Sequence, residues 1–136
     1  MADYRETVDY ILGIPLFAQK IGKENLSSLL CRLGNPEKAV PAIHVAGTNG
    51  KGSTCRALAQ MLAAQGYRVG LFISPHLVSI NERIQINGTN ISDDDFVSAF
   101  ETVKGQFMEH PSFFEVMFAM AAVYFRQQKC DFAVYE

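Results

Sequence analysis

The chain has 136 residues, of which 49% are hydrophobic and 19% charged, and its formal net charge is -2. These values are typical of one globular domain and exclude a disordered, collagen-like or coiled-coil chain. Lys and Arg form no cluster, so nucleic acid is not expected as a partner. The longest apolar run, 116–125, is too short to cross a membrane, and the acidic N-terminus is unlike a secretory signal. We therefore expect a cytoplasmic protein without a membrane partner.

The first forty residues predict two helices. Apolar residues at helical spacing in 3–12 are followed by Pro15, and a second helix from about Glu24 ends at Gly34-Asn35-Pro36. We expect residues 1–40 to form a helical segment and residues 41–136 to form an α/β part that follows it.

The remaining sequence alternates between strand and helix patterns. The expected elements are, in order, a strand at 42–46, a helix ending at Gly66, a strand at 69–73, a hairpin at 83–91, helices beginning after Ser92 and at 112–128, and a strand at 132–136. Because a helix connects the first two strands, they are expected to pair in parallel. The hairpin, centred on Asn87-Gly88, is expected to be a small surface ribbon. The predicted fold class is α/β, a parallel sheet flanked by helices.

Residues 47–54, Gly-Thr-Asn-Gly-Lys-Gly-Ser-Thr, lie between a predicted strand and a predicted helix. Glycines allow backbone N–H groups to surround phosphate oxygens, and the helix N-terminus adds partial positive charge. Lys51 would reach the outer phosphates, and Ser53 or Thr54 would meet a magnesium ion. The strict phosphate-loop pattern is not met, because Val45 replaces its first glycine and Gly52 follows the lysine. The alternative is a plain glycine-rich connection, but the coincidence of all these features favours a phosphate-binding loop.

Four segments in order carry a resemblance to a known family. They are 46–54, Ser74-Pro75-His76-Leu77, Asn81-Glu82-Arg83-Ile84 and Ser112-Phe113-Phe114-Glu115. Together they resemble the folylpolyglutamate synthases and dihydrofolate synthases, which are ATP-dependent members of the Mur ligase superfamily. Gly52 is the most specific feature, since the peptidoglycan branch typically lacks a second glycine after the lysine. The resemblance implies that the chain is the first part of an ATP-binding domain of the Mur ligase central type, which contains a P-loop. The rest of that domain and the C-terminal domain would be absent.

The resemblance also implies three sets of site residues. The ATP phosphates would be held by Thr48, Asn49, Gly50, Lys51, Gly52 and Ser53, with Lys51 as the catalytic residue. The metal ligands for Mg²⁺ would be Ser74 and Glu136. The folate or pteroate substrate would contact Gln19, Lys20, Ile21, Gly22, Ser112, Phe113, Phe114 and Glu115, although 19–21 is not a close match to the family.

The function implied by the resemblance is that of an ATP-dependent ligase. It would add L-glutamate to folate, to dihydropteroate or to both, through an acyl phosphate, and the full-length protein would be a monomer. These 136 residues alone are expected to be inactive. The alternatives are a nucleotide-binding module without catalysis and another Mur-type amino-acid ligase.

Several candidate residues also have a structural explanation. Ser74-Pro75 is compatible with a plain turn after a strand, and Glu115 with stabilisation of a helix start. No catalytic role is assigned to His44, His76 or His110.

Overall fold

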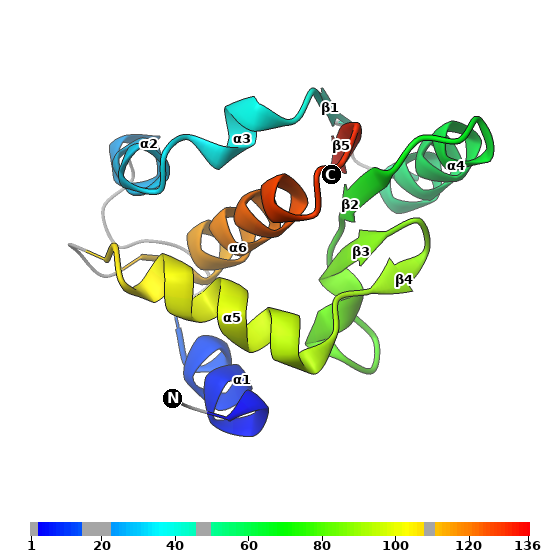
Figure 1. Ribbon diagram of the computed structural model, residues 1–136. Coiled ribbons are helices and arrows are strands. Elements are labelled where there is room, and N and C mark those ends of the chain that lie inside the picture. The colour runs from blue at the N-terminus through cyan, green and yellow to red at the C-terminus, as the bar shows by residue number, and fades with distance from the viewer. Residues whose placement is uncertain (1–2, 15–22, 46–49, 108–110) are drawn as a thin grey trace.

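The computed structural model describes residues 3–14, 23–45, 50–107 and 111–136. Its centre is a five-stranded sheet with the order β1-β5-β2-β3-β4 (Figure 1). The strands are β1 (Ala42–His44), β2 (Val69–Phe72), β3 (Ile84–Ile86), β4 (Thr89–Asn90) and β5 (Phe132–Tyr135). The helices are α1 (Tyr4–Leu12), α2 (Lys23–Arg32), α3 (Pro36–Ala39), α4 (Lys51–Ala64), α5 (Asp93–Lys104) and α6 (Phe113–Gln127), with a 3₁₀ helix η1 (Ile80–Arg83).

The predicted elements are present, and two short helices were missed. The four-residue helix α3 begins at Pro36, which ends the preceding helix pattern but also suits the first position of a helix. The 3₁₀ helix η1 is held by a capping box in which Ser79 and Glu82 bond to each other's backbone. Helices this short carry no apolar periodicity, so the sequence pattern does not reveal them.

The parallel part of the sheet is β1-β5-β2, which confirms the α/β class. The expected direct pairing of β1 with β2 was wrong, because β5 lies between them and pairs with both. A central parallel strand is covered on both faces, and Ala133 and Val134 of β5 are fully buried. Strand β1 is instead the edge of the described sheet, and His44 in this strand is exposed.

The hairpin extends the sheet and is not the separate surface ribbon that was expected. Strand β3 pairs antiparallel with β2, and β4 pairs with β3. Successive side chains of β3 point to opposite faces of the sheet, so Ile84 and Ile86 both point into the hydrophobic core. Their burial explains why the hairpin is part of the sheet. Asn87 and Gly88 both have positive φ angles, 48° and 81°, as a tight hairpin turn requires.

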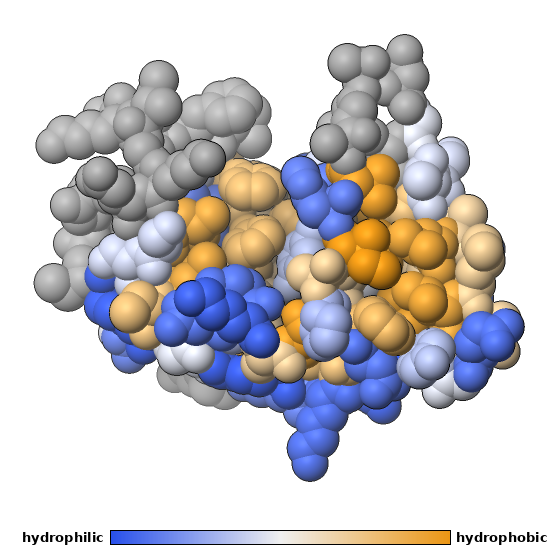
Figure 2. Space-filling model, turned by 90° about the horizontal axis from the view of Figure 1, so that it is seen from above, coloured by the Kyte–Doolittle hydropathy of each residue, from blue (hydrophilic) through white to orange (hydrophobic). Residues whose placement is uncertain are grey.

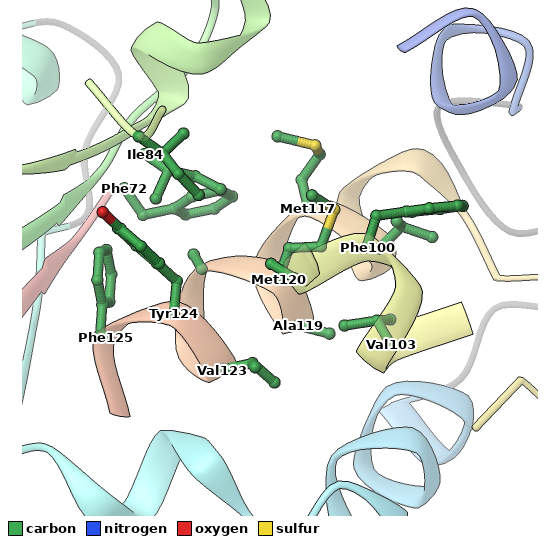
Figure 3. Close-up of a cluster of buried hydrophobic side chains, with 14 of the residues drawn as sticks. Phe72, Ile84, Phe100, Val103, Met117, Ala119, Met120, Val123, Tyr124 and Phe125 are labelled. Carbon is green, nitrogen blue, oxygen red and sulfur yellow. The ribbon is translucent and has the colours of Figure 1, made fainter. Parts of the chain in front are cut away.

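Helix α6 supplies most of the core on one face of the sheet. Figure 3 shows Phe72, Ile84 and Phe125 gathered between the sheet and α6, while Phe100 of α5 lies on the other side of that helix. Eleven residues of α6 are buried, which confirms that a helix apolar nearly all round is packed on more than one side. The helices α1, α2 and α3 also contact α6.

The opposite face of the sheet is covered by α4. Its apolar cluster is smaller and comprises Cys55, Ala59, Val69, Leu71, Ile73 and Val134. Apolar surface gathers on the side of the molecule where β1 and α4 lie (Figure 2). Met61 of α4 is 65% exposed. Among the helices described here, none is both long and apolar enough to span a membrane.

Candidate functional site

The candidate site lies at the carboxyl ends of the three parallel strands, which together form one edge of the sheet. His44, Tyr135 and Phe72 are in register across β1, β5 and β2. Two backbone bonds continue this alignment beyond the strands, from Val45 N to the Tyr135 carbonyl (2.8 Å) and from Glu136 N to the Phe72 carbonyl (3.0 Å). The chain segments that leave these strands therefore meet at one edge, where open α/β sheets bind their ligands.

Glu136 is the charged residue at the centre of this edge. Its Oε2 atom is buried and has no hydrogen-bond partner among the described residues. A Cβ atom placed on Gly52 would lie 3.6 Å from this oxygen, so the first turn of α4 closely approaches the carboxylate. A buried carboxylate oxygen without a hydrogen bond is costly, so this oxygen is available to a cation or a hydrogen-bond donor.

Helix α4 begins where the glycine-rich segment ends. Gly50 has a φ angle of 75°, a left-handed conformation that favours glycine, and its carbonyl accepts a hydrogen bond from Thr54 N. Ser53 and Thr54 are exposed in the first turn. Of the predicted phosphate ligands, Gly50, Lys51, Gly52 and Ser53 are thus at the helix N-terminus, while Thr48 and Asn49 lie outside the described residues.

The loop that follows β2 is folded back onto η1 by the Glu82 carboxylate. Backbone N–H groups of Leu77, Val78 and Ser79 donate to the two oxygens of Glu82 at 2.9, 3.0 and 2.7 Å. These bonds lower the pKa of Glu82, because they stabilise the charged form. Ser74, the predicted metal ligand at the end of β2, begins this loop and is exposed.

Arg83 connects the loop with the start of α6 and with Glu136. Its Nε donates to His76 Nδ1 at 2.8 Å, and its guanidinium lies 5.0 Å from the centre of the Phe113 ring. Burial lowers the pKa of Arg83, while the charge of Glu136 acts in the opposite direction. Burial and the Arg83 charge lower the pKa of His76, so the imidazole is suited to accept this bond. Arg83 was not among the predicted site residues, although it belongs to the segment 81–84 that resembles the family.

Two of the four predicted substrate residues at α6 bond to each other. Ser112 N donates to Glu115 Oε1 at 2.8 Å, and Glu115 N donates to the Ser112 hydroxyl at 3.2 Å, so both side chains are buried in a capping box. The stabilisation of the helix start that we considered for Glu115 is therefore present. Phe113 is buried under Arg83, whereas Phe114 is 47% exposed.

The structure brings Gly52 and Glu136 together and places the Arg83 guanidinium over the Phe113 ring. Ser74 leaves the strand next to the one that ends at Glu136. The predicted substrate residues 19–22 lie outside the described residues. The roles of all these residues stay predictions.

The folded loop leads to a first testable prediction. Because the pKa of Glu82 is lower in the folded protein, its contribution to stability is present above the ordinary value of 4.5 and is lost as the pH falls through the lowered value. We expect Glu82→Gln to reduce the hydrogen-exchange protection of the amides of residues 77–79 at neutral pH. Glu101→Gln, at a half-buried position of α5, is the matched control. Unchanged protection in Glu82→Gln would contradict the role of this carboxylate.

The fold and its carboxyl edge define an α/β domain of the kind that binds its ligand at the ends of parallel strands. No protein-family model matches the chain. Among curated proteins, it is 40% identical to a dihydrofolate synthase/folylpolyglutamate synthase of Bacillus subtilis, over 98% of this chain and 33% of that protein. It is 39% identical to a folylpolyglutamate synthase of Lacticaseibacillus casei, with the same coverage.

Solved structures give the same result. A folylpolyglutamate synthase of Thermotoga maritima matches with a TM-score of 0.91 and 42% identity, covering 98% of this chain and 32% of that one. A folylpolyglutamate synthase in complex with AMPPCP and folate matches with a TM-score of 0.90 and 40% identity, covering 98% and 34%. The chain belongs to the folylpolyglutamate synthase/dihydrofolate synthase family, and it spans about a third of the length of the relatives it matches.

Proposed function

We propose that this chain provides the ATP phosphate site and part of the magnesium site of a ligase that adds L-glutamate to folate, to dihydropteroate or to both. The observation that carries the proposal is the buried Glu136 oxygen beside Gly52, which has no hydrogen-bond partner among the described residues and lies near the N-terminus of the helix that follows the glycine-rich segment. It is supported by the match to a synthase that holds AMPPCP and folate. The ligase is proposed to act as a monomer.

The residues at the edge fit a magnesium ion. Within the described ranges, no group of three or more His, Cys, Asp and Glu residues is placed to hold a metal. Magnesium is commonly bound through one or two carboxylates, with water and substrate phosphates completing its coordination. One Glu136 carboxylate oxygen that lacks a hydrogen bond from the described residues, with the Ser74 hydroxyl just after the adjacent strand, suits that preference.

The chain's own residues would act mainly by binding and orientation. The α4 N-terminus and Lys51 would bind the phosphates of ATP, and their positive charge would stabilise the phosphoryl group during its transfer. A bound magnesium ion would offset further negative charge on the phosphate oxygens. The phosphoryl group would pass to a carboxylate of the folate or pteroate, and the amino group of glutamate would then displace phosphate to form the amide. No side-chain nucleophile is required.

The acceptor substrate is proposed to bind beside the start of α6. The exposed ring of Phe114 and the guanidinium of Arg83 above Phe113 offer an apolar and a cationic contact to an aromatic, carboxylate-bearing molecule. This location lies along the same edge as Glu136, whose charge acts on Arg83.

A second prediction concerns the metal. In the full-length protein that contains this chain, we expect Glu136→Gln to raise the magnesium concentration needed for half-maximal activity by at least the ~10- to 100-fold typical of losing an outer-shell partner. Asp131→Asn, five residues earlier and bonded to the backbone of Arg68, is the control. An unchanged magnesium requirement would remove Glu136 from the metal site.

The function is tested by acceptor-dependent ATP hydrolysis in the full-length protein. Dihydropteroate, tetrahydrofolate and a muramyl precursor are compared, each with glutamate present. We expect hydrolysis with one or both pteridine compounds. Hydrolysis with the muramyl compound alone would indicate another Mur-type ligase, and ATP binding without any acceptor-dependent hydrolysis would indicate a nucleotide-binding module.

A further inference from the structure

Asn81 is a buried polar residue that the proposed reaction does not use, and only 4% of it is exposed. Its Oδ1 accepts hydrogen bonds from the hydroxyls of Tyr4 (2.5 Å) and Ser79 (3.1 Å). Its Nδ2 donates to the Ile91 carbonyl (2.8 Å) and to the Asp93 carboxylate (3.1 Å). The amide therefore uses its full bonding capacity, two acceptor and two donor positions. It fastens η1 to α1, to the end of the hairpin and to the first turn of α5.

The side chains of Glu82 and Arg83, the two residues that follow Asn81, form hydrogen bonds with the loop after β2. Glu82 accepts the three N–H groups of residues 77–79, and Arg83 bonds to His76. The Arg83 carbonyl also accepts a bond from Ile73 N (3.0 Å). The position of the loop is thus set by the position of η1, which Asn81 holds.

The Tyr4 hydroxyl is a fixed partner for this amide. The Tyr4 ring packs edge-to-face on Phe96 of α5, with ring centres 5.8 Å apart. The N-terminus of α1 is capped by Asp3, whose side chain accepts a bond from Glu6 N. Figure 1 shows α1 lying alongside α5, and the two helices are in contact. Because Tyr4 is anchored independently of η1, its hydroxyl can hold Asn81 in one place.

We propose that Asn81 is a positioning residue of the ligase and acts together with the Tyr4 hydroxyl. The pair holds η1 so that Arg83 keeps its place over Phe113, beside the proposed acceptor site. The inference rests on the proposed function, since it concerns the acceptor of that reaction. Helix α4, whose N-terminus would bind the ATP phosphates, packs on the other face of the sheet, so the KM for ATP is expected to change less than the KM for the acceptor.

Tyr4→Phe tests the inference, because it removes only the hydroxyl. In the full-length protein we expect the KM for the pteridine acceptor to rise about 2- to 10-fold, the effect of one net hydrogen bond, while the KM for ATP changes less. Amides of residues 77–79 should also exchange faster with solvent. Tyr10→Phe is the matched control, since this hydroxyl on the same helix belongs to a half-exposed ring that packs on Phe100.

A purely structural role for Tyr4 predicts a different result. Tyr4→Phe would then lower thermal stability and leave both KM values and the exchange of residues 77–79 unchanged, which would overturn the inference. A wild-type protein without acceptor-dependent hydrolysis would overturn the proposed function itself. An active wild type in which Tyr4→Phe and Tyr10→Phe behave alike would overturn only the role of Asn81 and Tyr4.

Discussion

Lys51→Ala in the full-length protein is expected to lower kcat for acceptor-dependent ATP hydrolysis by about 10²- to 10³-fold, the usual cost of removing one group that stabilises charge in a transition state. Lys51 is the first residue of α4, at a helix N-terminus that follows the left-handed Gly50. Its ammonium group would offset negative charge on the phosphoryl group in transfer. Steady-state kinetics with saturating ATP and acceptor would measure the effect.

Lys38→Ala is the matched control for this change, because Lys38 is an exposed lysine at the end of α3. It should leave kcat unchanged, and the circular dichroism spectra of both variants should match that of the wild type. Normal turnover in Lys51→Ala would remove the glycine-rich segment from the ATP site.

Gly70→Ala is expected to reduce the free energy of unfolding by about 1–3 kcal/mol, the typical cost of overpacking a core. Gly70 lies in β2, and a Cβ atom there would come within 2.6 Å of the Phe125 ring. The ring is fully buried between α6 and the sheet, as Figure 3 shows, so it has little room to move. Urea denaturation would measure the loss.

Gly105→Ala is the control, since Gly105 has a right-handed helical φ of -62° and the nearest atoms to an added Cβ are at an ordinary 3.6 Å. Its effect should stay within about 0.5 kcal/mol. The Gly70→Ala cost should also be smaller in a Phe125→Leu background, because the ring is what the methyl group meets. Equal costs in both backgrounds would show that the ring contact is not the cause.

The local structure was largely predictable from the sequence. Apolar spacing, Ser92, Ser112 and Asn87-Gly88 indicated the helices and the hairpin close to their observed bounds. These signals act over a few residues, within one element. Strand order depends on contacts between distant segments, so the placement of β5 between β1 and β2 was not predictable from them.

In the candidate site, too, some features could be predicted from the sequence and others depend on contacts in the folded chain. The glycine-rich segment could be proposed from its motif, and Ser74 and Glu136 from the resemblance to the family, which suits their positions after neighbouring parallel strands. The bonds of Asn81 to Tyr4 and of Arg83 to His76 could not, since they follow from the folding of the loop onto η1. The mutual bonds of Ser112 and Glu115 also show that a family-like segment can serve the helix start.

The most direct test of the central claim follows oxygen atoms in the reaction of the full-length protein. The acceptor is prepared with ¹⁸O in its reacting carboxylate and incubated with ATP and glutamate. If the carboxylate is phosphorylated and glutamate then displaces phosphate, one ¹⁸O atom must appear in the released phosphate for each amide formed. Glutamylated product with labelled phosphate is the expected result. Hydrolysis of ATP that releases only unlabelled phosphate, without a glutamylated product, would contradict the account.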